Sequence, residues 1–309
     1  MLTFRKHKDN ITIAQIKDGK DKKDIYIKRT YDNKAKPEID TTDEEKEEIF
    51  NEYLENLTNP ITKKEHNLLL QHYKDNNDDL DNAKLYKILT KGIDFVNTSL
   101  KRYLNFKEQI VFPYLDRKYW CIYVTGMSGS GKSYFISEFI YQNKHNIPKD
   151  AGIFLVGPYD DDTSYKKIFN NVIYVDPIKY ENENGEYFNC KSIPKGSVVI
   201  WDDIESMDNS KYIEQLRDKM LGIYRHHDLK LFCVSHKSLG GKSTSKCILE
   251  SQYFVCFKDN WAHTHTLLST YMKMNEEHLN LIHNQNSRWF FICKNNPSYF
   301  ISEVSVGLL

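Results

Sequence analysis

The sequence predicts an α/β fold in which a mostly parallel central sheet lies between helices. Two observations support this prediction. After about residue 110, short apolar runs alternate with stretches of helical periodicity, as in βαβ units. These runs are nearly continuous in valine, isoleucine and phenylalanine, which suits parallel strands that are covered on both faces. The chain has 309 residues, enough for one large domain or two modest ones.

The N-terminal part of the chain differs in composition, because lysine, aspartate, glutamate and asparagine dominate it. We expect residues 1–110 to form a largely helical extension and residues 111–309 to form the main domain. Three helices are expected, starting near residues 42, 62 and 80. Thr62 and Glu65 fit a capping box at the second start, and Gly92 is expected to break the third helix. The extension is interpreted as a cap on the main domain, with a partner-docking or substrate-entry module as the alternative.

The first forty residues contain only weak strand-like pieces, and no structure is assigned to them. In the main domain the apolar runs give eight candidate strands, and the stretches between them give five candidate helices. The strands are Trp120–Thr125, Ile153–Val156, Val172–Val175, Val198–Trp201, Lys230–Ser235, Tyr253–Phe257, Trp289–Cys293 and Tyr299–Val304. The helices fall at about residues 132–144, 210–227, 243–250, 264–273 and 275–284.

Charge and cysteine content exclude several classes of protein. The 43 basic and 43 acidic side chains balance, so the chain is not a generally basic protein that coats nucleic acid. None of the six cysteines forms a C-x-x-C pair, which favours buried free thiols over disulfides or a zinc site. The N-terminus has no apolar signal segment, and no apolar run could span a membrane. We therefore expect a protein that is not secreted, has no membrane partner and works in a reducing compartment.

The most informative segment fits the phosphate-binding pattern G-x-x-x-x-G-K-[ST] at every fixed position and lies between a predicted strand and a predicted helix. Its glycines let backbone N–H groups turn toward phosphate oxygens, and the helix N-terminus adds partial positive charge. Lys132 is expected to reach the β- and γ-phosphates of ATP, and the Ser133 hydroxyl to bind Mg²⁺. The expected nucleotide-binding residues are Gly126, Met127, Ser128, Gly129, Ser130, Gly131, Lys132, Ser133 and Tyr134.

A second signal is the apolar strand at residues 198–201 that ends in paired carboxylates, which is the Walker B form. Asp202 is expected in the Mg²⁺ shell, and Asp203 is placed to orient or deprotonate the attacking water. Glu205 is the alternative base. An enzyme with its own base at this position is more typical of an ATPase than of a small-molecule kinase. The N-K-x-D pattern of simple GTPases is absent from the sequence.

Two further residues flank the predicted strand at residues 230–235. His236 follows its end, where a polar side chain can sense the γ-phosphate, and the alternative is a residue that only caps the strand. Arg225 precedes it, where it could stabilise transition-state charge in the site of a neighbouring subunit. The alternative for Arg225 is an ordinary surface arginine.

The order of these segments, GMSGSGKS, then VVIWDD, then YRHHDLKLFCVSH, resembles the genome-packaging ATPases of large DNA viruses of the poxvirus type and of their satellite viruses. These proteins belong to the FtsK–HerA group. The resemblance covers roughly residues 115–309 and implies a RecA-like P-loop NTPase core. Arg225 and His226 match the arginine–histidine pair of the family. The family usually has glutamine where this chain has His236.

The resemblance implies an ATP-hydrolysing DNA translocase that packages viral DNA into the capsid. It implies Mg²⁺ as the metal, and a homo-oligomeric ring, a pentamer or a hexamer, as the assembly. Double-stranded DNA and capsid or portal components are the implied partners, and the host cytoplasm at the viral assembly site, or the virion, is the implied location. Lysines in residues 237–246, interpreted as a flexible basic loop, could contact the DNA backbone. The alternatives are another P-loop enzyme, such as a small-molecule kinase or helicase-type ATPase, or a nucleotide-binding assembly scaffold.

Overall fold

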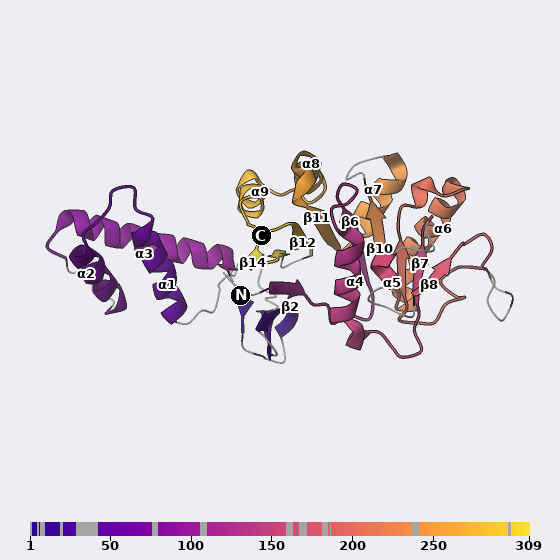
Figure 1. Cartoon of the computed structure of the whole chain (residues 1–309), viewed down its shortest axis with the longest axis horizontal. Helices are drawn as coiled ribbons and strands as arrows, with labels where there is room; N and C mark the ends of the chain where they lie inside the picture. Colours follow the sequence, from indigo (N-terminus) through magenta and orange to yellow (C-terminus); the bar gives the residue numbers. More distant parts are fainter. Residues whose placement is uncertain are drawn as a thin grey trace. The chain divides into compact units, whose positions relative to one another are not determined.

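The computed structural model of the chain (Figure 1) divides into two compact units. The first comprises Met1–Ile11, Ile25–Asn105 and Leu308, and the second comprises Thr12–Asp24, Phe106–Gly307 and Leu309. The residues that the structure describes are 2–4, 6, 10–18, 21–28, 43–75, 80–105, 110–158, 163–166, 172–180, 185, 187–236, 241–295 and 298–309.

The first unit contains three helices, α1 (Asp43–Glu55), α2 (Lys63–Lys74) and α3 (Ala83–Arg102), which pack against one another. The predicted capping box is present: Thr62 Oγ1 accepts from the Glu65 N–H (3.2 Å), and the Glu65 carboxylate accepts from the Thr62 N–H (2.7 Å). The core of the unit is formed by the buried residues Phe50, Leu54, Leu69, Leu85, Leu89 and Val96.

The expected break at Gly92 is wrong, because α3 runs through this residue without interruption. A Cβ atom at this position would clash with the ring of Phe50. Phe50 in turn stacks on Tyr73, with the ring centroids 4.2 Å apart. The glycine is therefore a packing residue that lets α1 approach α3, and the gain in apolar burial outweighs its poor helix propensity.

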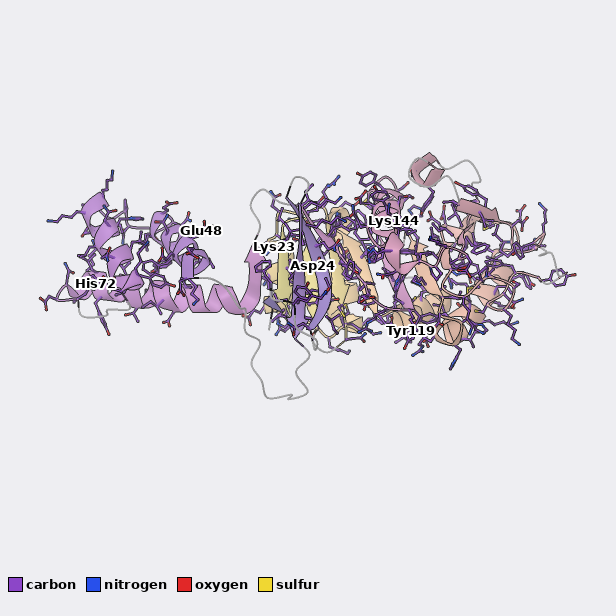
Figure 2. The ribbon with its side chains drawn as sticks, turned by 90° about the horizontal axis from the view of Figure 1, so that it is seen from below. Lys23, Asp24, Glu48, His72, Tyr119 and Lys144 are labelled. Atoms are coloured by element: carbon purple, nitrogen blue, oxygen red, sulfur yellow. The ribbon has the colours of Figure 1, made fainter. Side chains whose placement is uncertain are left out.

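Part of the N-terminal segment that was left without structure forms strands. In the first unit, β1 (Leu2–Thr3) pairs antiparallel with β3 (Asp21–Lys28), with Leu2 opposite Ile27. In the second unit, β2 (Asn10–Asp18) pairs antiparallel with β5 (Ile110–Pro113). Asp24, labelled in Figure 2, accepts a hydrogen bond from Gln15 Nε2 at 2.9 Å. β2 carries few apolar residues, and Ile13, Ala14 and Ile16 are the buried ones, so the strand is specified by its pairing more than by its own pattern.

The second unit is built on a large sheet in the order β14-β13-β12-β11-β6-β10-β9-β7-β8. Its central strands, from β11 to β8 in this order, pair in parallel, whereas β12 and β13 are antiparallel to their neighbours. The predicted mostly parallel α/β fold is confirmed. The strands are β6 (Trp120–Thr125), β7 (Ile153–Val156), β8 (Val172–Val175), β9 (Val198–Trp201), β10 (Lys230–Ser235), β11 (Tyr253–Phe257), β12 (Trp289–Cys293), β13 (Tyr299–Ser302) and β14 (Ser305–Leu308).

Two boundaries of the second unit differ from the sequence prediction. The expected strand Tyr299–Val304 is two strands, because the chain turns after Ser302, whose hydroxyl accepts from the Ser305 N–H at 2.9 Å. Part of the expected flexible loop at residues 237–246 is helical, because α7 begins at Gly241. Residues 237–240 lie outside the described part of the chain. The helices are α4 (Lys132–Gln142), α5 (Thr163–Lys166), α6 (Ser210–Ile223), α7 (Gly241–Glu250), α8 (Trp261–Tyr271) and α9 (Glu276–His283).

The core of the second unit is rich in aromatic rings. Trp120 of β6 and Phe139 of α4 both pack edge-on against Phe232 of β10, with centroids 4.9 and 5.7 Å away. All six cysteines are buried and free, which confirms the expectation of buried thiols. Among the described residues, no helix combines the length and the apolar character that a membrane span would need.

Candidate functional site

The parallel sheet brings the predicted site segments to one edge. β10 lies between β6 and β9, with Ser235 opposite Thr125 and Cys233 opposite Trp201. Because the carboxyl ends of parallel strands meet at the same edge, the loop after β6, the carboxylates after β9 and His236 after β10 all lie there. These three segments are spread over residues 126–236 of the sequence, and the strand order makes them neighbours.

The loop after β6 has the backbone that a phosphate-binding loop requires. Gly129 and Gly131 have φ angles of 78° and 100°, a region that residues with a Cβ rarely adopt. Gly131 is the N-cap of α4 and has no side chain to accept hydrogen bonds from the first turn. The N–H groups of that turn thus remain available to an anion. Met127 and Tyr134 are 51% and 61% exposed at the two ends of the loop.

Gly126 is required for another reason, because a Cβ there would lie 2.7 Å from Ser130 Oγ and 2.9 Å from Phe257 Cβ. The Ser130 hydroxyl is buried and has no hydrogen-bond partner among the described residues. An unsatisfied buried hydroxyl is costly, and an incoming phosphate oxygen could satisfy it. Ser128 is exposed, and Ser133 is partly buried in the first turn of α4.

Lys132 is only 6% exposed, and its ammonium is held by the loop itself. Nζ donates to the carbonyl oxygens of Gly126 (2.9 Å) and Met127 (2.8 Å). Burial lowers the pKa of Lys132, while the negative charges of Asp202, Asp259 and Asp203 act in the opposite direction. Lys132 and the carboxylates after β9 therefore face the same small volume.

His236 connects the two halves of the site. Its Nδ1 lies 3.1 Å from Lys132 Nζ, and its Nε2 lies 3.6 Å from Asp203 Oδ1. A charged lysine can only donate, so Nδ1 must then accept and the neutral ring carries its proton on Nε2, toward Asp203. The imidazole ring thus lies between the Lys132 ammonium and the Asp203 carboxylate and is within contact distance of both.

Asp202 is oriented by a residue that the sequence did not indicate. Its Oδ2 accepts a hydrogen bond of 2.8 Å from the hydroxyl of Tyr165, a buried residue of α5. The Asp202 N–H donates to Val156 O (2.9 Å), and a Cβ on Gly157 would lie 2.8 Å from Asp202 O. The close approach of the chain after β7 therefore requires a glycine at position 157 and fixes the backbone that carries the carboxylate.

Asp203 has a φ angle of 49°, a conformation that costs energy for a residue with a side chain. Such strain is often found where a side chain must point in one direction for function. Ser206 Oγ donates to the Asp203 carbonyl at 2.7 Å and supports this turn. Glu205 lies at the surface of the same turn, and its pKa is raised by burial and by the charge of Asp203.

The residues at this edge suit Mg²⁺ by their chemistry. The Ser133 hydroxyl and the Asp202 carboxylate are hard oxygen donors, and Mg²⁺ prefers one or two such protein ligands together with phosphate oxygens and water. The hydrogen bond from Tyr165 to Oδ2 orients the Asp202 carboxylate. Among the described residues, three or more acidic, histidine or cysteine side chains do not gather into a metal cluster of their own.

Arg225 lies at the opposite edge of the sheet. It belongs to the short 3₁₀ helix Tyr224–His227, which comes before the start of β10. Its Nη2 donates to Glu250 Oε2 at the end of α7 (3.1 Å), and the side chain is half exposed. Within one chain, Arg225 is therefore remote from Lys132. Arg288, a second exposed arginine, donates from Nε (2.9 Å) and Nη2 (2.8 Å) to Glu303 Oε1.

Three residues of the site were missed by the sequence reasoning. Tyr165 stands more than thirty residues from the nearest motif, and nothing in its local sequence marks it. Asp259 follows the end of β11 and Gly157 follows the end of β7. A search for polar residues and glycines directly after each predicted strand would have found these two, because all these strand ends lie at the same edge.

Comparisons with known proteins return proteins similar to parts of this chain, although no family model matches it. A protein of Sputnik virophage named "uncharacterized protein V3" is 24% identical over 190 residues, covering 59% of this chain and 74% of that protein. Solved structures similar to this chain include the pCW3 conjugation coupling protein TcpA with ATPγS (12% identity, TM-score 0.38, 94% of this chain and 76% of that one).

The genome packaging NTPase B204 of Sulfolobus turreted icosahedral virus 2, in complex with ATPγS, is a further match. It is 13% identical with a TM-score of 0.42, over 60% of this chain and 97% of that one. The sequence motifs predicted a resemblance to genome-packaging ATPases, and a structure described as a genome packaging NTPase is among those similar to this chain.

Proposed function

We propose that the chain is an ATP-hydrolysing DNA translocase that packages viral genomic DNA into the capsid. One observation carries the proposal: Lys132 of the loop, Asp202 and Asp203 after β9, and His236 after β10 share one small volume at the carboxyl edge of the sheet. A glycine-bent loop that faces two strand-borne carboxylates is what binding and hydrolysis of a magnesium–triphosphate require. The resemblance of the motifs to packaging ATPases supports the DNA substrate.

In this proposal each residue has a distinct role. The loop N–H groups and Lys132 bind the β- and γ-phosphates, and Lys132 exchanges its carbonyl partners for phosphate oxygens. Ser133 and Asp202 hold Mg²⁺, which neutralises charge on the phosphates when it is bound. Asp203 accepts a proton from water as the water oxygen attacks the γ-phosphorus, and the bond from that phosphorus to the β–γ bridging oxygen breaks. When Lys132 moves to the phosphates, His236 loses its contact with the Lys132 ammonium and changes position.

The position of Arg225 favours action in a neighbouring subunit. It lies at the edge of the sheet away from Lys132, it is half exposed, and its partner Glu250 is at the surface. In a ring of identical chains, this edge of one subunit can face the carboxyl edge of the next. Arg225 would then supply positive charge to the phosphates of that site.

The experiment that tests the proposal measures ATP hydrolysis with and without double-stranded DNA, together with the oligomeric mass in solution. A translocase gives a ring-sized mass and a rate that DNA increases. A monomer that phosphorylates a small molecule without a response to DNA would indicate a kinase. ATP binding without turnover would indicate an assembly scaffold, and either result would overturn the proposal.

A further inference from the structure

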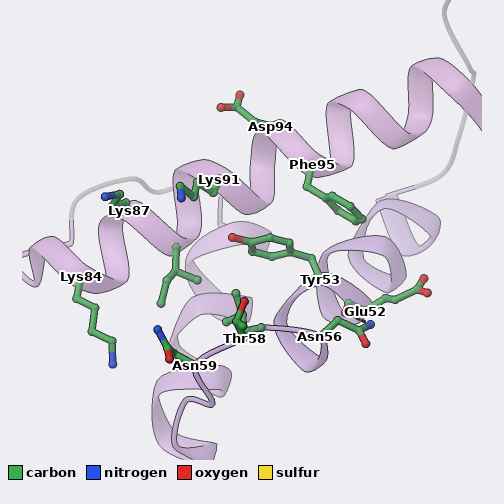
Figure 3. Close-up of a pocket in the computed structure, with 12 residues that line it drawn as sticks. Glu52, Tyr53, Asn56, Thr58, Asn59, Lys84, Lys87, Lys91, Asp94 and Phe95 are labelled. Atoms are coloured by element: carbon green, nitrogen blue, oxygen red, sulfur yellow. Dashed lines mark hydrogen bonds between the residues drawn. The ribbon is translucent and has the colours of Figure 1, made fainter. Parts of the chain in front are cut away.

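We propose that the hollow between α1 and α3 in the first unit is a docking groove for an acidic peptide segment of a partner protein, which packs one large apolar side chain on Tyr53 and Phe95. The hollow has a volume of about 750 Å³ and is formed by α1, the segment after it and α3 (Figure 3). This inference does not depend on the proposed ATPase activity, because the residues of the groove all belong to the helical unit.

The floor of the groove is apolar and aromatic. The rings of Tyr53 and Phe95 lie 5.4 Å apart between centroids, and Leu57 and Ile88 contribute aliphatic surface beside them. Phe95 is 44% exposed, whereas Tyr53, Leu57 and Ile88 pack against the apolar core of the unit. Figure 3 shows Tyr53 and Phe95 both pointing into the space between the helices. An aromatic floor in a concave surface is typical of a position that receives an anchoring side chain.

One rim of the groove is basic. Lys84, Lys87 and Lys91 are spaced three and four residues apart on α3, which places them on one face of the helix beside the floor. All three are exposed. Among the described residues of this unit, ion pairs join Lys46 to Asp43 and Lys74 to Glu47, and none involves the three lysines of the rim. The rim therefore offers positive charge that carboxylates of a partner could meet.

The other end of the groove decides which class of polyanion fits. Glu52 and Asp94 lie near Phe95, at the end away from Lys84 (Figure 3). A nucleic-acid strand carries charge on every nucleotide and would pass these carboxylates, at a cost in free energy. A peptide can place its carboxylates at the lysine end only and its apolar anchor at the other. Docking of an amphipathic helix in a groove between two helices is an established mode of this kind.

The test uses the full-length chain and fluorescence anisotropy of labelled synthetic peptides of about four helical turns. The first peptide carries its glutamates in one half and leucine with one tryptophan at helical spacing in the other half. A second peptide replaces every glutamate by lysine, and a third replaces the tryptophan by serine. A single-stranded oligodeoxynucleotide of similar length represents the other class of ligand. We expect the first peptide to bind at least about tenfold more tightly than any of the other three probes.

Matched variants locate the binding. Phe95→Ala and the double change Lys87→Glu/Lys91→Glu should each weaken binding of the first peptide about tenfold. Tyr86→Ala is the control for the first, because Tyr86 is on the same helix with 45% exposure but outside the groove. Lys63→Glu/Lys64→Glu on α2 is the control for the second. The circular dichroism of every variant should match the unchanged chain.

Three results would overturn the proposal. The first is equal binding of the acidic and the basic peptide, or no binding of any peptide. The second is tighter binding of the oligonucleotide, which would assign the groove to nucleic acid. The third is an equal loss with Tyr86→Ala and Phe95→Ala. ATP hydrolysis by Phe95→Ala, measured in parallel, should be unchanged, so failure of the groove and failure of the ATPase site are separately visible.

Discussion

A buried lysine lies at the carboxyl ends of the parallel strands and another at their amino ends, and the two lysines have different roles. At the carboxyl edge, Lys132 donates to the carbonyls of Gly126 and Met127. At the amino edge, Lys230 is 2% exposed and donates to the carbonyls of Lys118 and Gly196, both at 3.1 Å. Burial lowers the pKa of both lysines. Carbonyl ligands alone therefore do not mark a functional lysine.

The surroundings of the two lysines separate them. Three carboxylates act on Lys132, and a histidine touches it, whereas Asp228 is the charge that acts on Lys230. Lys132 also starts a helix whose first N–H groups are uncapped, so an anion could replace its carbonyl partners. Lys230 instead joins the segments at residues 118, 196 and 230 and has a structural role. A buried lysine is therefore a candidate for ligand binding when an anion could take the place of the carbonyl oxygens that it now contacts.

The largest effect is expected from Lys132→Ala. Loss of the ammonium removes a principal charge on the β- and γ-phosphates, so ATP hydrolysis should fall on the order of 10³-fold or below detection. The free energy of unfolding should change little, because the variant also removes a buried charge. Steady-state phosphate release and urea unfolding measure the two quantities. A rate equal to that of the unchanged chain would show that Lys132 has no role in ATP hydrolysis.

Arg225→Ala tests whether an amino-edge residue acts across subunits. We expect turnover in the assembled state to fall on the order of 10³-fold, while nucleotide binding to the isolated chain stays the same. Mixtures of Arg225→Ala with Lys132→Ala should regain activity, because an intact Lys132 and an intact Arg225 then meet in some sites. Activity of the mixture that equals the sum of its parts would contradict the role in trans.

Asp203→Asn distinguishes the two candidate bases. If Asp203 accepts the proton from water, turnover should fall by about 10²-fold or more, and Glu205→Gln should retain most of it. Both changes keep the size of the side chain, and asparagine tolerates the φ angle of 49° at position 203. Rates measured in one series at saturating ATP give the comparison. The reverse pattern would assign the base to Glu205.

Lys230→Met tests the structural lysine. The variant leaves two buried carbonyls without a donor, so the free energy of unfolding should fall by about 1–3 kcal/mol. The variant also removes a buried positive charge, which is stabilising, so we expect the loss of free energy of unfolding to lie at the lower end of this range. ATP hydrolysis below the unfolding temperature should be unaffected, measured beside thermal unfolding by circular dichroism. A large loss of activity in a folded variant would show that the two edges are not separate.

The smallest effect concerns pH. The folded pKa of Glu205 is raised by burial and by Asp203, so its favourable contribution is present below the unfolded pKa and is lost as pH rises through the folded pKa. At neutral pH, Glu205→Gln should therefore raise Tm slightly over the unchanged chain. The difference should vanish at about pH 4, where glutamate is largely protonated. A constant difference in Tm across this range would contradict the raised pKa.

Much of the second unit could be predicted from the sequence. The β6, β7, β9 and β10 strands are short runs of β-branched and aromatic residues that are buried on both faces, and such runs carry a clear signal. The phosphate-binding loop could also be predicted from local sequence, because the positive φ angles at positions 129 and 131 require glycine. The edge on which the site lies follows from parallel pairing.

The parts that could not be predicted depend on contacts between distant residues. Gly92 has a poor helix propensity, and only the ring of Phe50 explains why α3 continues through it. Tyr165 becomes part of the site through its hydrogen bond to Asp202 across 37 residues of sequence. The turn after Ser302 contains no glycine or proline and is closed by serine hydroxyls instead. Such contacts between distant residues cannot be predicted from local sequence patterns.

The course of α7 has a mechanical consequence. The helix starts at Gly241, soon after His236, and returns to the amino edge, where its last residue Glu250 holds Arg225. Ten helical residues make a rod of about 15 Å. A movement of α7 along its axis would therefore shift Glu250, the partner of Arg225. If Arg225 acts in a neighbouring subunit as proposed, such a movement of α7 would reach the nucleotide site of that subunit.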